Sequence, residues 1–403
     1  MSENFLPYGR QSITEADKKA VLDVLESDFL TTGPKVAEFE KIFAEYVRAP
    51  HAICMSSATA ALHLAALALD IGEGDCVLAP SMSFAATANG AAYTGARIEF
   101  MDCDPESGLV TPQLFTEAAD RAEASGNPAK MAVIVHLNGE HADMAGIAEE
   151  ACKRNIRLVE DACHALGTTF VDRQGDGHMV GACRYSVMST FSFHPVKTLT
   201  TGEGGIVTCR DEALANRIKD LRSHGIVRDK DRMLHIDMAH DQSGDLNPWY
   251  YEMQTLGYNY RLTDIACALG VSQMERMPEF AERRREMKRL YDDLFAESNL
   301  PVRTINSDEG VDSVRHLYPL LIDFEAIGMS RAEFMQKLRD NGIGTQVHYI
   351  PIHAQPYYKQ INPELQLNGA SDYYEKVISI PFYPDLTDDD IKRVVKSIAE
   401  VMR

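Results

Sequence analysis

The stretch that decides the fold covers residues 191–205 and reads F-S-F-H-P-V-K-T-L-T-T-G-E-G-G. An alternating apolar run over residues 185–193 predicts one strand, and Gly205–Cys209, after the glycine-rich turn, predicts a second. Lys197 therefore lies at the mouth of a sheet. Open α/β sheets bind ligands where strands end in small-residue loops, and a lysine that is desolvated there becomes a nucleophilic amine. Most lysines are solvated surface groups, so the surrounding residues must support a catalytic role for Lys197.

Strands and helices alternate along the chain before this stretch. This order predicts an α/β fold with a mostly parallel sheet, helices on both faces and ligands at the carboxyl ends of the strands. The predicted strands cover residues 51–55, 76–80, 97–102, 131–136 and 156–161, and the predicted helices include residues 112–123 and 144–155.

The last third of the chain departs from this alternation. A helical pattern opens at Thr263 and continues to about Ser298, which is long enough to bridge two domains. Because 403 residues exceed the usual size of one core, we expect a large domain over residues 1–265 and a small α+β domain over residues 266–403. In the small domain we predict strands at 316–322, 343–349 and 377–380, a helix at 330–341 and a C-terminal helix capped at Thr387.

Residues 227–254 form a polar excursion between the two predicted domains. The excursion contains the only tryptophan of the chain, Trp249. Loops of this length are usually functional or mobile, although no motif in this one indicates a particular role.

Composition narrows the class of partner. A formal net charge of -20 argues against nucleic acid and anionic membranes, but a local cluster of amide N–H groups can still bind a small anion. No apolar run reaches membrane-spanning length and residues 1–5 show no export signal, so we expect a cytoplasmic protein. The eight cysteines lie singly and lack zinc spacing, which favours reduced thiols and no metal site.

Three further segments each allow a ligand-binding and a structural interpretation. The small residues 56–60, between a strand and a helix, form either a phosphate cradle or a helix N-cap at Ser57 or Thr59. Asp161 ends a buried strand, where a carboxylate needs a cation or a capping role. Phe84 is either a core residue or an aromatic platform.

Together, these residues resemble the fold-type-I pyridoxal-phosphate (PLP) aminotransferases, and within them the DegT-type sugar-nucleotide aminotransferases. The resemblance covers nearly the whole chain and rests on six motifs in family order. These are residues 30–34 (LTTGP), 56–63 (SSATAALH), 160–167 (EDACHALG), 192–197 (SFHPVK) with 203–205 (EGG), 257–262 (GYNYRL) and 348–351 (HYIP).

The resemblance implies a catalytic role for two residues and a cofactor contact for two more. Lys197 would bind PLP covalently, and Asp161 would hold the pyridine nitrogen protonated, which makes the ring an electron sink. Phe84 would stack on the ring, and His164 would lie near its phenolic oxygen.

The cofactor phosphate is expected to lie at the small-residue turn. The resemblance implies that Thr59, Ala60 and Ser192 bind this phosphate, and that Asn259 reaches the phosphate of a neighbouring subunit. The active unit would then be a homodimer with shared sites.

Contacts to the sugar nucleotide are expected from Tyr8, Thr32, Arg261 and His348, although each also has a structural interpretation. Residues 200–205 and 222–225 most resemble the pseudaminic acid branch of the family. The implied reaction moves an amino group from glutamate to C4 of a UDP-4-keto-6-deoxy-N-acetylhexosamine, giving UDP-4-amino-4,6-dideoxy-N-acetyl-β-L-altrosamine.

Other functions remain open at this point. Synthesis of GDP-perosamine or UDP-4-amino-arabinose would use the same chemistry. Lys197 argues against the dehydratase branch of the family, which has histidine at that position. A PLP-binding regulatory protein without turnover is disfavoured because the lysine and the carboxylate are both present, and a plain dinucleotide-binding module is disfavoured because no G-x-G-x-x-G follows the first strand.

Overall fold

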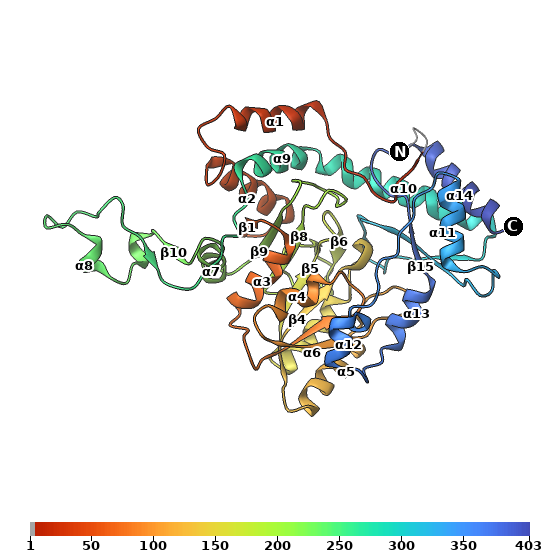
Figure 1. Ribbon diagram of the computed structural model, residues 1–403, viewed down its shortest axis with the longest axis horizontal. Helices are drawn as coiled ribbons and strands as arrows, with labels where there is room; N and C mark the ends of the chain where they lie inside the picture. The colour runs from red at the N-terminus through yellow and green to blue at the C-terminus, as the bar shows by residue number, and fades with distance from the viewer. Residues whose placement is uncertain (1–4) are drawn as a thin grey trace.

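The computed structural model describes residues 5–403 (Figure 1). Residues 1–4, part of the N-terminal stretch in which we expected no export signal, lie outside it. A seven-stranded sheet in the order β1-β9-β8-β5-β4-β2-β3 forms the centre of the molecule. Its strands are β1 (His51–Met55), β2 (Cys76–Pro80), β3 (Arg97–Met101), β4 (Ala129–Val135), β5 (Arg157–Asp161), β8 (Met188–Ser192) and β9 (Gly205–Cys209).

Only β9 runs against the other strands of this sheet. It pairs antiparallel with both β1 and β8, whereas the four remaining pairings in the sheet are parallel. The prediction of a mostly parallel sheet is therefore confirmed, and the glycine-rich turn before Gly205 is where the chain reverses.

Helices cover both faces of the sheet because its strands are apolar on both sides. On one face, α3 (Ala58–Ala68) and α7 (Glu212–Arg222) pack against Ile53, Val133 and Val207. On the other face, α5 (Pro112–Ala124) and α6 (Met144–Lys153) cover one half of the sheet and α2 (Pro34–Val47) covers the other half. The remaining helices of this part are α1 (Glu15–Leu25), which begins at a Thr14–Asp17 capping box, and the short α4 (Ala86–Ala92).

The predicted long helix from Thr263 to Ser298 is wrong in one respect, because the structure divides it into α9 (Asp264–Glu275) and α10 (Met277–Ser298). The break falls at Arg276, two residues before Pro278 in the first turn of α10. Proline has no amide proton for the carbonyl four residues earlier and clashes with that turn, so a continuous helix is disfavoured. α9 packs against α1 and α2.

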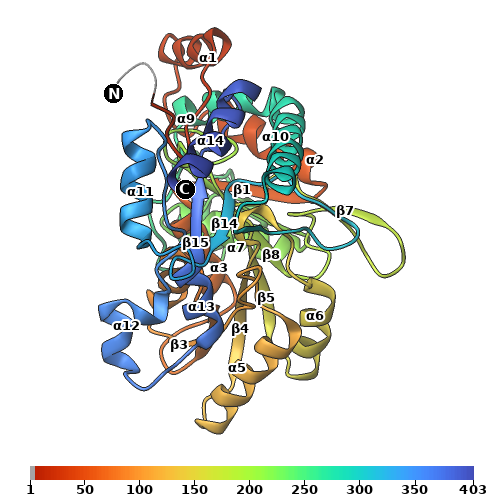
Figure 2. The ribbon, with the colours of Figure 1, turned by 90° about the vertical axis from the view of Figure 1, so that its right-hand side faces the viewer.

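The C-terminal part contains a three-stranded antiparallel sheet in the order β12-β14-β15 (Figure 2). Its apolar core brings Tyr291 and Phe295 of α10 together with Phe334, Ile380 and Ile398. The elements are β12 (Val302–Thr304), β14 (Tyr318–Ile322), α11 (Arg331–Asp340), α12 (Pro356–Ile361), α13 (Asn368–Lys376), β15 (Val377–Ile380) and α14 (Asp388–Val401), which begins at the expected Thr387 cap. The domain boundary at 265/266 stays a prediction.

The strand predicted at residues 343–349 is wrong. Ile343 and Gln346 form only isolated bridges, to Leu6 and Ser379, and the rest of the segment is irregular. After Gln346 the segment forms no further bridge to β15, and His348 and Tyr349 line a cavity.

Sequence reasoning also missed a small sheet, β13-β6-β7, formed by β6 (Thr169–Val171), β7 (Gly177–Met179) and β13 (Val311–Asp312). The excursion leaves the body of the molecule at β10 (Ile226–Val227), passes through α8 (Ile236–Ala239) and returns at β11 (Glu252–Met253) (Figure 1). No helix within residues 5–403 is long and apolar enough to cross a membrane.

We expect Gly205→Ala to destabilise the protein. A Cβ atom at this position would lie 2.4 Å from the amide nitrogen of Ala58, so β9 and the start of α3 would have to separate. Overpacking of this kind costs roughly 1–3 kcal/mol of unfolding free energy, which urea denaturation followed by circular dichroism measures. Gly72→Ala is the matched control because nothing lies within 4 Å of its Cβ position, and an equal loss in both variants would contradict the prediction.

Candidate active site

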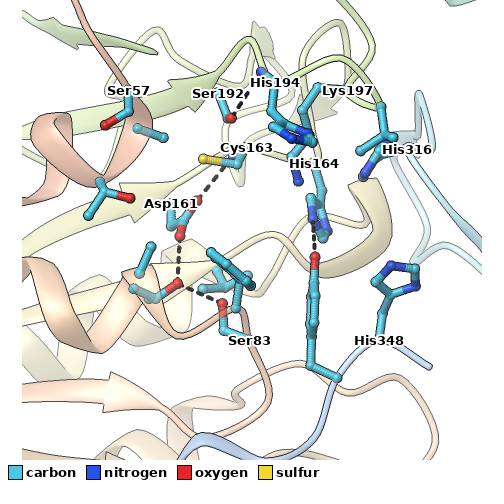
Figure 3. A pocket seen from close by; sticks show the side chains of 18 of the residues that line it. Ser57, Ser83, Asp161, Cys163, His164, Ser192, His194, Lys197, His316 and His348 are labelled. Carbon is cyan, nitrogen blue, oxygen red and sulfur yellow. Dashed lines mark hydrogen bonds between the residues drawn. The ribbon is translucent and has the colours of Figure 1, made fainter. Parts of the chain in front are cut away.

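A cavity of about 370 Å³ opens at the carboxyl ends of the parallel strands (Figure 3). Asp161 at the end of β5, Ser192 at the end of β8 and the start of α3 contribute to its wall. The loop that carries Lys197 closes one side, and the irregular segment with His348 and Tyr349 closes another. The structure thus brings together residues from stretches far apart in the sequence, from Tyr8 to Tyr349.

Lys197 points into this cavity from the loop after β8 (Figure 3). Its backbone amide donates to the carbonyl of His194 at 2.8 Å, which fixes a tight turn. Burial lowers the pKa of the Lys197 amine, while the negative charges of Cys163, when ionised, and Asp161 oppose this shift. The net effect favours the neutral, nucleophilic amine.

Asp161 lies at the floor of the cavity and is buried. One carboxylate oxygen accepts a 2.7 Å hydrogen bond from the Thr87 hydroxyl, which is itself 2.7 Å from the Ser83 hydroxyl. The other oxygen accepts from the backbone amide of Cys163 at 3.2 Å. No helix begins here, so the helix-cap alternative for Asp161 is wrong and the carboxylate braces a turn instead.

The small residues after β1 form the N-terminus of α3. Ser57 is its N-cap, and its hydroxyl accepts from the amide of Ala60 at 3.1 Å, as the structural interpretation predicted. Ala58 and Thr59 line the cavity, and the first amides of a helix have no partner within the helix. Ala60 is buried behind them and is absent from the cavity wall, so its amide serves the cap.

Three buried histidines form the opposite wall. The Nδ1 atom of His348 lies 2.9 Å from the Ser379 hydroxyl, and burial lowers the pKa of His348 to about 3. Burial also lowers the pKa of His164 and of His316 well below the ordinary value. All three are therefore neutral near pH 7, and Nδ1 of His316 has no hydrogen-bond partner within residues 5–403.

The remaining predicted residues divide into two groups. Phe84 lies at the rim, 60% exposed, with its ring 5.9 Å from that of Tyr349, and the Tyr8 ring lies 5.2 Å from that of His348. Thr32, Asn259 and Arg261 do not line the cavity, and Thr32 and Asn259 are exposed.

Several residues of the wall were not foreseen. Thr87 lies in a run of small residues after β2 that gave a usable signal, because such a run at a strand end often faces a ligand. Tyr349 stands inside a motif that we had quoted only for His348. Cys163, His194 and Glu203 lie within the motifs quoted above but had been given no role, and Ser83 lies in the same run of small residues as Thr87. His316 had no sequence signal.

The open α/β sheet, with a desolvated lysine and a buried carboxylate facing one cavity, defines a fold-type-I PLP-dependent aminotransferase. Residues 11–399 match the DegT/DnrJ/EryC1/StrS aminotransferase family, and the chain belongs to this family.

Among curated relatives, the chain is 37% identical to the UDP-4-amino-4,6-dideoxy-N-acetyl-beta-L-altrosamine transaminase of Campylobacter jejuni, over 98% of this chain and 97% of the relative. It is 35% identical to the spore coat polysaccharide biosynthesis protein SpsC of Bacillus subtilis, over 99% and 98%.

Among solved structures, Helicobacter pylori PseC, an aminotransferase of pseudaminic acid biosynthesis, superposes with a TM-score of 0.85 at 28% identity, covering 99% of each chain. The putative sugar aminotransferase Spr1654 of Streptococcus pneumoniae in its PMP form gives a TM-score of 0.86 at 27% identity, covering 98% and 99%. The same protein is also known in a PLP form.

The cavity fits PLP by the chemistry of its side chains. It offers an amine for the aldehyde, a carboxylate for the pyridine nitrogen and a helix N-terminus for the phosphate. Gly205 packs directly against the backbone of Ser57 and Ala58, since even a methyl group there would meet backbone atoms, and this fixes the start of α3 against β9. The unpartnered Nδ1 of His316 leaves a further polar atom for a bound reactant.

In the cofactor-free protein we expect the pKa of the Lys197 amine, read as the pH at which its rate of acylation is half-maximal, to lie below 10.5, because burial disfavours the ammonium form. Asp161→Asn removes a charge that raises the Lys197 pKa, so the midpoint should fall further. Mass spectrometry of the Lys197 peptide after a short pulse of acylating reagent, across a pH series, measures both. An upward shift in the Asn variant would contradict this electrostatic account.

We expect Thr87→Val to weaken PLP binding several-fold and to lower stability by about 1.5–3 kcal/mol, because the buried Asp161 carboxylate loses a hydroxyl donor. Titration with PLP, followed by the absorbance of the bound cofactor, and urea denaturation measure the two effects. Thr94→Val is the control, since that hydroxyl bonds only the Ala91 carbonyl, outside the cavity. Unchanged PLP affinity in Thr87→Val would show that this bond does not support the cofactor site.

Proposed function

We propose that the protein transfers the amino group of glutamate to C4 of a UDP-4-keto-6-deoxy-N-acetylhexosamine, giving UDP-4-amino-4,6-dideoxy-N-acetyl-β-L-altrosamine. The observation that carries the aminotransferase chemistry is the placement of Lys197 and Asp161 in one cavity. The choice of sugar is supported by the near full-length similarity to the altrosamine transaminase of C. jejuni and to PseC of H. pylori.

Each residue of the cavity has a task in this proposal. When bound, PLP supplies an electron sink that stabilises negative charge at the donor Cα. In the first half of the reaction the neutral Nζ of Lys197 would move the proton from the donor Cα to the aldehyde carbon of the cofactor, and in the second half it would move a proton from that carbon to C4 of the acceptor sugar. Asp161 holds a proton on the pyridine nitrogen, and Phe84 covers the ring.

The phosphate of the cofactor is assigned to the start of α3. Thr59 and Ser192 line the cavity there and supply hydroxyl groups, next to the positive end of the helix dipole. Ala60 contributes indirectly, because its backbone amide donates a hydrogen bond to the Ser57 hydroxyl and so fixes the start of the helix.

A homodimer with shared active sites belongs to the same proposal. Asn259 is exposed and lies outside its own cavity, which supports a role at the site of a second copy. Its segment is nevertheless tied to the phosphate end, since the Ser56 amide donates to the Tyr260 carbonyl at 2.7 Å.

The sugar nucleotide is assigned to the open side of the cavity. Tyr8 and His348 lie in contact there and are proposed to bind it, together with Thr32 and Arg261 from outside the cavity. The similarity to SpsC, which is named for spore coat polysaccharide biosynthesis, favours a second candidate, another sugar-nucleotide acceptor such as those of GDP-perosamine or UDP-4-amino-arabinose synthesis.

We expect the PLP-loaded protein to convert glutamate to 2-oxoglutarate in a single turnover and Lys197→Ala to release none. A coupled assay for 2-oxoglutarate measures this step without any sugar. The second half of the reaction should then prefer the UDP-4-keto-6-deoxy-N-acetylhexosamine over GDP and pentose acceptors by at least about tenfold in kcat/KM. A higher kcat/KM for a GDP sugar would replace the proposed acceptor, and a lack of 2-oxoglutarate would refute glutamate as donor.

A further inference from the structure

Both ring nitrogens of His164 are already engaged. Its Nδ1 lies 3.2 Å from the backbone amide of Asn138, and its Nε2 lies 3.1 Å from the hydroxyl oxygen of Tyr349. A backbone amide can only donate, so Nδ1 accepts and carries no proton. In the neutral ring the proton is then on Nε2, and this N–H donates to Tyr349.

The Asn138 amide is held firmly in this direction. Asn138 adopts a left-handed backbone conformation with φ +62°, its side-chain amide donates to Tyr373 at 3.1 Å, and its carbonyl accepts from the His316 amide at 2.9 Å. Two contacts of Asn138 therefore hold the amide that sets the tautomer of His164.

Tyr349 is left with a proton to donate. Its oxygen accepts from His164, and the hydroxyl has no other hydrogen-bond partner within residues 5–403. The ring lines the cavity that Lys197 also lines, and its hydroxyl oxygen lies 3.1 Å from Nε2 of His164. The Tyr349 hydroxyl therefore has an uncommitted proton at the wall of the cavity.

The order of substituents on pyridoxal phosphate identifies what faces this wall. Around the ring, the phosphate arm is followed by the aldehyde carbon, the phenolic oxygen, the methyl group and the pyridine nitrogen. With the phosphate at α3, the aldehyde at Lys197 and the nitrogen at Asp161, the phenolic oxygen must lie on the side away from α3. That side is the wall that carries His164 (Figure 3), and Tyr349 lies next to His164 in this wall.

We propose that Tyr349 donates the hydrogen bond to the phenolic oxygen of PLP and that His164 is a positioning residue that acts through Tyr349. This revises the expected contact of His164 with that oxygen, and it rests on the cofactor placement in the proposed function but not on the identity of the sugar. A donor to an oxygen that bears negative charge strengthens cofactor binding.

Tyr349→Phe tests the proposal, because it keeps the ring and removes only the hydroxyl. Titration of the cofactor-free protein should show PLP binding weakened by about tenfold to a hundredfold, as for a lost hydrogen bond to a charged group, together with a shifted absorbance maximum of the bound cofactor. With 3-deoxypyridoxal 5′-phosphate as probe, which lacks the phenolic oxygen, wild type and Tyr349→Phe should bind equally. Tyr358→Phe is the control, since its hydroxyl bonds Asn89 outside the cavity.

His164 variants test the positioning role. His164→Phe should weaken PLP binding in the wild-type background but have no further effect in Tyr349→Phe, and His164→Gln, which keeps a donor, should restore part of the loss. Unchanged PLP affinity and absorbance in folded Tyr349→Phe would overturn the assignment to Tyr349. A full additional loss in the double variant would show that His164 contacts the cofactor itself. None of these measurements uses a sugar, so failure of the proposed acceptor would be seen separately.

Discussion

The structure depends on keeping a charged carboxylate buried at the end of a central strand. Asp161 lies in a position where an unpaired charge would cost several kcal/mol, and two donors, the Thr87 hydroxyl and the Cys163 amide, compensate for part of this. A bound molecule with a positively charged group in the cavity would compensate for the rest of the charge on Asp161. The strand order places the lysine-bearing loop after β8, the direct neighbour of β5, so the amine and the carboxylate face the same space.

The second property of the site is that its histidines carry no charge. His164, His316 and His348 surround an amine that must itself be neutral to react, and burial lowers the pKa of all four groups. A wall of neutral imidazoles can hold hydrogen-bonding geometry without adding positive charge beside Lys197. Hydroxyl groups such as those of Ser379 and Tyr349 complete the bonding of this wall.

The sequence allowed much of the fold to be predicted, because alternating apolar runs and caps are local signals. β1, β2, β9 and β15 have the expected limits, and α14 begins at the expected cap. The failures came from tertiary contacts. Residues 343–349 have the composition of a strand, yet the segment leaves the sheet to place two side chains in the cavity. The hydroxyl of Tyr349 matters only because His164, 185 residues away, points at it, and spacing in a sequence cannot show that.

The excursion at residues 226–253 has a consequence for spectroscopy. Trp249 is the only tryptophan of the chain, it is 72% exposed, and it lies on this projecting segment rather than near the cavity. Its emission therefore reports the polarity around the projection and should change little when a ligand binds near Lys197. Contact of the projection with another apolar surface would shift that emission to shorter wavelength, which gives the molecule a built-in optical probe of assembly that is separate from its chemistry.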